Sequence, residues 1–141
     1  MTKCRFLLVL WFVSFSLLSK DLNLLPNFSN DNPLSYQFVR SIAQDQHGFM
    51  WFGTQEGLHR YDGYQFVSYH HRTEDPNSIG ADVVSRVLVD KIGRLWVATR
   101  GGGLNLFNAS QSNFYRFNQS SQTSIAHNNV NALFEDSEGK I

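Results

Sequence analysis

The chain has 141 residues, with 12 basic and 12 acidic side chains, a formal net charge of zero and one cysteine. A neutral chain has no overall field to attract nucleic acid or an anionic lipid surface. Cys4 precedes an apolar run near the N-terminus. The chain after that run therefore has no disulfide, no cysteine nucleophile and no cysteine zinc site.

Residues 1–19 are predicted to be a secretory signal peptide. Lys3 and Arg5 form a basic start, residues 6–18 are apolar, and Ser19 is a small residue at a plausible cleavage point. The apolar run is shorter than the roughly 17–25 residues of a membrane-spanning helix. An uncleaved N-terminal anchor is the alternative. In both cases we expect the remainder of the chain to be exported.

Residues 20–33 are expected to form an extended lead-in, because Pro26 disfavours a long helix.

The sequence after this lead-in contains an internal repeat. The pattern Asp-x-x-Gly-x-x-Trp-x-x-Thr begins at Asp45 and again 45 residues later at Asp90. A third copy begins at Asp136, 46 residues after the second, and the sequence reaches its last residue before the tryptophan position. We predict repeats at residues 34–78 and 79–124, and a truncated one at 125–141.

Each repeat is predicted to contain short strands, because its apolar segments are brief and rich in Val, Ile, Leu and Phe. The expected first strands are residues 38–45, 83–90 and 129–136. The expected second, third and fourth strands are residues 49–54, 58–62 and 64–69 in one repeat and residues 94–99, 104–108 and 113–117 in the next.

The Asp-x-x-Gly element suits a tight turn between the first and second strands. The carboxylate of Asp45, Asp90 or Asp136 can accept backbone N–H groups across the turn. Glycine adopts the positive φ that other residues resist, and it recurs at the same offset as Gly48, Gly93 and Gly139. The fixed offset of Trp51 and Trp96 from these turns favours packing between repeats over sugar stacking.

A tandem unit of four antiparallel strands and about 45 residues is the sequence signature of a β-propeller blade. The predicted fold is therefore all-β, with two blades and part of a third. Closure takes typically 4–8 blades, so the propeller would be incomplete within these residues.

The repeats resemble the two-component regulator propeller repeat. In the first copy the matching positions are Asp45, Gly48, Trp51, Gly53, Thr54, Gly57, Leu58, Tyr61, Asp62 and Gly63. The second copy departs from the pattern with Ala98 in place of glycine and Phe107-Asn108 in place of Tyr-Asp. The resemblance covers about residues 34–141.

This resemblance implies a bacterial receptor with a periplasmic sensor propeller, a membrane helix and a cytoplasmic histidine kinase or diguanylate cyclase. The implied location is the periplasm, as part of an inner-membrane receptor that pairs with a second copy. The remaining blades, the membrane contact and the enzymatic output would belong to sequence outside these residues. For this segment we expect sensing of a small molecule or glycan, with no catalysis and no cofactor.

No metal site is expected either. One carboxylate per turn supplies too few oxygens for calcium, which takes six to eight. The adjacent His70 and His71 would point to opposite faces of an extended segment.

The candidate ligand-binding residues are polar side chains at one end of the predicted blades. Arg40, Arg86 and Asn131 lie near the starts of the first strands, while Gln55 and Arg100 lie in the turns after the second strands. A guanidinium group suits carboxylates, sulfates or sugar hydroxyls.

Two other functions fit an exported propeller: a glycosidase or lyase, and a secreted protein-binding propeller. The sialidase Asp-box resembles these turns but places glycine two residues after aspartate, whereas here the spacing is three. An enzyme would also need carboxylates that break the repeat, and we find none in the sequence.

Overall fold

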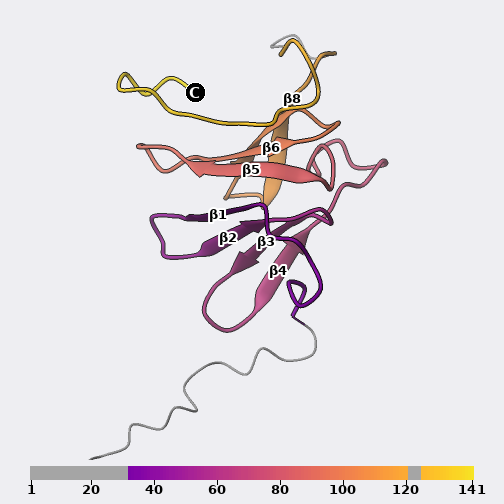
Figure 1. The fold of residues 1–141 in the computed structure, drawn as a ribbon, viewed down its shortest axis with the longest axis vertical. Coiled ribbons are helices and arrows are strands. Elements are labelled where there is room, and N and C mark those ends of the chain that lie inside the picture. Colours follow the sequence, from indigo (N-terminus) through magenta and orange to yellow (C-terminus); the bar gives the residue numbers. More distant parts are fainter. Residues whose placement is uncertain (1–31, 121–124) are drawn as a thin grey trace, which may run out of the picture.

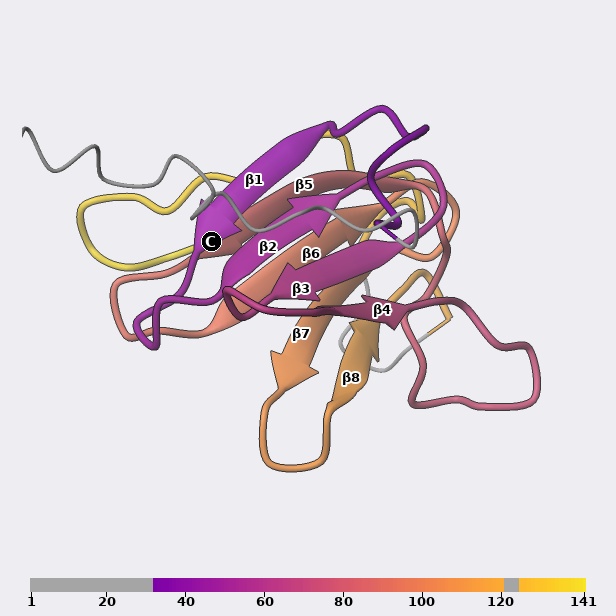
Figure 2. The same ribbon diagram turned by 90° about the horizontal axis from the view of Figure 1, so that it is seen from below.

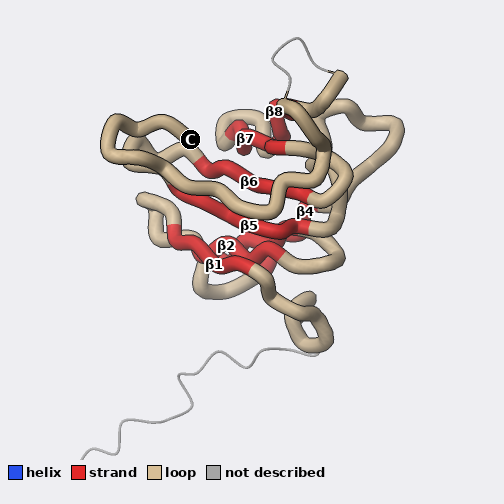
Figure 3. The backbone as a smooth tube through the Cα atoms, turned by 45° about the horizontal axis from the view of Figure 1, so that its top comes forward, coloured by secondary structure: helices blue, strands red, loops and turns tan. Residues whose placement is uncertain are grey.

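The computed structural model describes residues 32–120 and 125–141, so the expected signal peptide lies outside the described part. Eight strands form two four-stranded antiparallel sheets that stack on each other, with the orders β1-β2-β3-β4 and β5-β6-β7-β8 (Figures 1 and 3). The first sheet contains β1 Ser41–Gln44, β2 Met50–Gly53, β3 Leu58–Tyr61 and β4 Phe66–Tyr69. The second contains β5 Val84–Val89, β6 Leu95–Thr99, β7 Leu104–Asn108 and β8 Asn113–Phe117.

The predicted all-β fold of four-stranded blades is confirmed. Each sheet is a meander in which every strand pairs with the next one along the chain. We call the first sheet blade 1 and the second blade 2. Within the described residues, no helix is long and apolar enough to span a membrane.

The first strand of blade 1 is shorter than predicted. Residues 33–36 form turns, and regular pairing begins only at Ser41, opposite Gly53. The Arg40 N–H group still donates to the Gly53 carbonyl at 2.8 Å, which adds one hydrogen bond before the strand.

The strand predicted at residues 129–136 was wrong. Asn129 forms an isolated bridge with Arg100, and the rest of the segment has no regular pairing. The physical reason is that a first strand pairs with the second strand of its own blade, and residues 125–141 do not include such a strand. The turn itself forms, with Gly139 at φ 81°.

Residues 125–141 nevertheless follow blade 2 as β5 follows blade 1 (Figure 1). The Val84 N–H group donates to the Thr54 carbonyl at 2.8 Å, and the Val130 N–H group donates to the Thr99 carbonyl at 3.1 Å. Both bonds join the start of one unit to the end of the second strand of the preceding unit. The same connection is thus used twice.

The core lies between the two blades, where β1 and β2 stack on β5 (Figure 2). The Val87 N–H group donates to Ser41 Oγ at 2.9 Å across this interface. The ring centroid of Trp51 lies 4.9 Å from that of Phe107, in an edge-to-face arrangement. The buried core residues are Trp51, Leu58, Ile79, Val84, Val87, Leu95, Val97 and Phe114.

The blades approach each other closely at Gly53, which yields a testable prediction. A Cβ atom at Gly53 would lie 2.5 Å from Val84 Cγ1. Gly53→Ala is therefore expected to lower the free energy of unfolding by about 1–3 kcal/mol in urea denaturation of the full chain. Ala98, at the equivalent position of blade 2, shows that a methyl group is compatible with the sheet itself.

The matched test is the double variant with Val84→Ala, which removes the clashing methyl group. We expect the two changes to be non-additive, with the double variant less destabilised than the sum of the single variants. Strict additivity would show that Gly53 does not set the distance between the blades.

Candidate functional site

One carboxylate organises the turn of each blade, most completely at Asp90. Asp90 Oδ1 accepts the N–H groups of Ile92 and Arg94 at 3.2 and 2.7 Å. Asp90 Oδ2 accepts Arg94 Nε–H at 2.6 Å and the indole Nε1–H of Trp96 at 2.9 Å. The Asp90 side chain is fully buried, so its charge is balanced by hydrogen bonds and the guanidinium group rather than by water.

The other two turns repeat this arrangement in part. Asp45 Oδ1 accepts two backbone N–H groups, and its Oδ2 accepts Trp51 Nε1–H at 2.8 Å. Asp136 accepts the N–H groups of Glu138 and Lys140 at 2.8 and 2.9 Å. The sequence analysis anticipated the backbone bonds but not the bond between aspartate and tryptophan. The fixed six-residue spacing between these two residues is the signal that could have revealed it.

The Asp90 turn is expected to contribute more stability than the Asp136 turn. Burial by itself would raise the pKa of Asp90, but the hydrogen bonds from Trp96 and Arg94, together with the Arg94 charge, lower it below the ordinary value. We expect Asp90→Ala to cost about 2–4 kcal/mol and Asp136→Ala about 1 kcal/mol or less, measured by urea denaturation.

The pH dependence of the unfolding free energy gives a second measurement of the contribution of Asp90. Because the folded-state pKa of Asp90 is lowered, its contribution is complete above the ordinary pKa of about 4 and is lost as the pH falls through the folded-state value. If Asp90→Ala and Asp136→Ala lowered the free energy of unfolding equally, the buried bonds to Trp96 and Arg94 would add no stability beyond that of the turn.

The candidate ligand-binding residues gather at the end of the sheets opposite the aspartate turns. Arg40 immediately precedes β1 and Gln55 follows β2, so both lie at the end of blade 1 where Gly53 pairs with Ser41. Arg100 follows β6 at the equivalent end of blade 2, and its N–H group donates to the Val83 carbonyl at 2.9 Å.

The other two candidates lie on β5 and on the segment that follows blade 2. Arg86 is inside β5, opposite Ala98, and Asn131 follows Val130 on the far side of blade 2. All five candidate side chains are exposed. Gln55 and Arg100 thus occupy equivalent positions after the second strands, and Arg40 lies at the same end of blade 1. The role of all five residues in binding stays a prediction.

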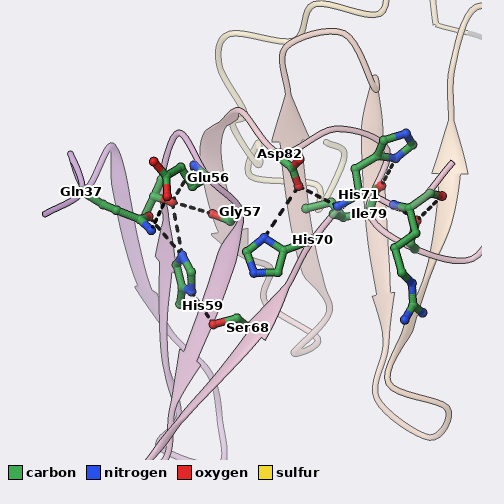
Figure 4. Close-up of polar contacts among 12 residues, drawn as sticks. Gln37, Glu56, Gly57, His59, Ser68, His70, His71, Ile79 and Asp82 are labelled. Carbon is green, nitrogen blue, oxygen red and sulfur yellow. Dashed lines mark hydrogen bonds and ion pairs between the residues drawn. The ribbon is translucent and has the colours of Figure 1, made fainter. Parts of the chain in front are cut away.

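A buried polar network connects the start of blade 1 to its second glycine turn, at residues 54–57, and this network was missed from the sequence. His59 on β3 is 1% exposed, and its Nδ1 lies 2.8 Å from Ser68 Oγ (Figure 4). Its Nε2 lies 3.2 Å from Gln37 Oε1 and 3.3 Å from Thr54 Oγ1. Since Gln37 Oε1 can only accept, the network places the ring proton of neutral His59 on Nε2.

Asn105 takes the equivalent place in blade 2. It pairs with Val97 as His59 pairs with Phe52, and the one-residue insertion between the strands of blade 2 places Asn105 46 residues after His59. Asn105 Nδ2 donates to the Val97 carbonyl at 3.1 Å, and Asn105 Oδ1 accepts the Gly80 N–H group at 2.8 Å. Each blade therefore uses a buried polar side chain to fix the segment that leads into it. A polar residue at the same point of both third strands is the available sequence signal.

The His59 network predicts a loss of stability in mild acid. Burial, with a smaller effect from the nearby His70, lowers the pKa of His59 from 6.5 to about 4. The unfolded chain therefore takes up the proton first. Stability from this residue is complete above about pH 6.5 and declines toward pH 4, by up to about 3 kcal/mol.

The matched variant is His59→Asn, the residue that blade 2 uses. The difference in unfolding free energy between the original chain and the variant should depend on pH between about 6.5 and 4. A constant difference across that range would show that His59 is not held neutral.

Residues 33–56 match the two component regulator propeller family. Histidine kinase P4 of Formosa agariphila is 36% identical over 69 residues, which cover 48% of this chain and 5% of that protein. A solved structure of the extracellular domain of a protein described as the hybrid two component system BT3049 of B. thetaiotaomicron is 31% identical, with a TM-score of 0.64. That match covers 72% of this chain and 14% of the solved chain.

A second extracellular domain, from the hybrid two component system BT4673 of B. thetaiotaomicron, is 24% identical with a TM-score of 0.59, over 73% of this chain and 14% of that chain. It supports the fold alone. The chain thus spans 5% of its curated relative and 14% of each solved domain. Together with the repeated Asp, Gly and Trp positions and the two stacked blades, these matches confirm the resemblance to the two component regulator propeller repeat, whose family model covers residues 33–56.

Proposed function

We propose that this chain contributes sensor blades to the extracellular propeller of a bacterial signalling receptor. The observation that carries the proposal is the 31% identity and TM-score of 0.64 to an extracellular domain of a hybrid two component system, over 72% of this chain. The blades act by binding, and this segment is not itself an enzyme. The output, a histidine kinase or a diguanylate cyclase, lies in another part of the receptor.

The proposed location is the periplasm, as part of an inner-membrane receptor. The basic start and apolar run of residues 1–19 support export, and the extracellular neighbours support a position outside the cytoplasm. The proposed partners are the remaining blades, a second copy of the receptor and a small-molecule or glycan ligand.

Ligand contact is proposed at the end of the blades that carries Arg40, Gln55 and Arg100, together with Arg86 and Asn131. Exposed guanidinium groups can donate two parallel hydrogen bonds to a carboxylate or sulfate. A ligand would signal by shifting the receptor between two arrangements, and only to the extent that it binds one of them more tightly.

The loop between β3 and β4 allows the proposed periplasmic location of the blades to be tested. Gly63 has no atom within 4 Å of a Cβ position, and Tyr64 is 94% exposed, so an epitope inserted between them should leave the blade intact. In the full-length protein we expect the epitope to be digested by protease in spheroplasts but not in intact cells. The protein itself should sediment with the inner membrane.

Deletion of residues 1–19 is the matched control and should leave the epitope protected in spheroplasts. A protein recovered in the culture medium or in the soluble periplasmic fraction would instead favour a secreted propeller. If the epitope were protected in spheroplasts in the protein that keeps residues 1–19, the blades would lie in the cytoplasm and the sensor proposal would be wrong.

A further inference from the structure

A cavity of about 400 Å³ lies between the two blades, at the end of the sheets that carries the aspartate turns. Its apolar walls come from both blades, namely Phe49, Trp51, Leu95 and Phe107, and two cationic side chains, Arg60 and Arg94, also line it. The volume is within the range of small-molecule sites, which are typically apolar with a few placed polar groups.

Arg60 is a charged residue at a place where the repeat otherwise uses an apolar one. In blade 1 it pairs with Trp51, and in blade 2 the residue paired with Trp96 is Leu106. The Arg60 guanidinium carbon lies 4.7 Å from the centroid of the Phe49 ring and 5.8 Å from that of Trp51. Since blade 2 forms with leucine at this position, the four-stranded unit does not require the charge.

Arg60 also has unused hydrogen-bonding capacity. Its Nε atom is buried and has no hydrogen-bond partner. Within residues 32–120 and 125–141, no carboxylate forms an ion pair with it. A buried donor without an acceptor is unfavourable and uncommon in folded proteins.

The other arginine of the cavity and the Asp45 carboxylate each have a charged or hydrogen-bonding partner. Arg94 Nε donates to Asp90 Oδ2 at 2.6 Å. The carboxylate of Asp45 accepts two backbone N–H groups and the Trp51 indole N–H. Among the described residues, Arg60 is therefore the arginine of this cavity whose charge has no carboxylate partner.

We propose that the cavity binds a small carboxylate whose body is a flat ring. The carboxylate accepts hydrogen bonds from the Arg60 guanidinium group, and the ring packs against Phe49 and Phe107. This site lies at the opposite end of the sheets from Arg40 and Arg100. It is separate from the ligand contact proposed above and does not depend on it.

The test compares benzoate with benzamide, a neutral molecule of nearly the same shape, by calorimetric titration of the full chain. Benzoate is expected to bind at least about 10-fold more tightly, because hydrogen bonds between charged groups are the stronger ones. Arg60→Leu should remove this preference by weakening benzoate binding about 10-fold and leaving benzamide binding unchanged. The control Arg72→Leu removes the same charge from the exposed linker and should alter neither affinity.

Thermal unfolding separates binding from a structural role. Arg60→Leu reproduces the pairing of Leu106 with Trp96, so we expect its melting temperature to equal or exceed that of the original chain. A lower melting temperature with unchanged benzoate binding would mean that Arg60 serves to pack against Phe49 and Trp51, and would overturn the proposal. Equal binding of benzoate and benzamide to the original chain, or no binding of either at millimolar concentration, would overturn it without any variant.

Discussion

A hydrogen bond between an aspartate carboxylate and a tryptophan indole couples the local turn of each blade to the core. Asp45 and Trp51 are joined at 2.8 Å, and Asp90 and Trp96 at 2.9 Å. A buried indole N–H group needs an acceptor, and here the acceptor is the same carboxylate that closes the preceding turn. The turn therefore fixes the ring, and the ring of Trp51 in turn packs against Phe107 of the next blade.

The stacking of blades follows from this coupling. One blade cannot bury its own face, so its tryptophan side is covered by the sheet that follows, and the connection from Thr54 to Val84 recurs from Thr99 to Val130. Each unit contacts its neighbours, as in other repeat architectures. Residues 125–141 occupy the place of a next blade without forming its sheet, because pairing requires a second strand.

The two blades share a fold, and the equivalent positions that hold different residues are the ones where their chemistry differs. His59 and Asn105 solve the same structural problem with different titration behaviour, since only the histidine changes charge between pH 4 and 7. Arg60 and Leu106 share a register position but not a role, because leucine adds packing whereas arginine adds an unpaired donor to a cavity. A fold made of repeats takes its specificity from such substitutions.

The repeat period, the strand order and the turns at Asp45, Asp90 and Asp136 could be predicted from the residues alone, because strand alternation, glycine conformation and aspartate turns act over a few residues. Those local rules suffice for the fold class. They gave no information on the strand pairing of residues 129–136, which depends on a partner strand.

The neighbours of each side chain depend instead on how the two blades stack. The pKa of His59 is lowered because the side chain is buried, with Gln37 and the rest of its network brought beside it from elsewhere in the chain. Arg60 lines a cavity because blade 2 closes over Trp51. Strand alternation predicts that His59 and Arg60, as neighbours on β3, point to opposite sides of the sheet. Which side is buried, and against which neighbours, is set by the stacking of one blade on the next.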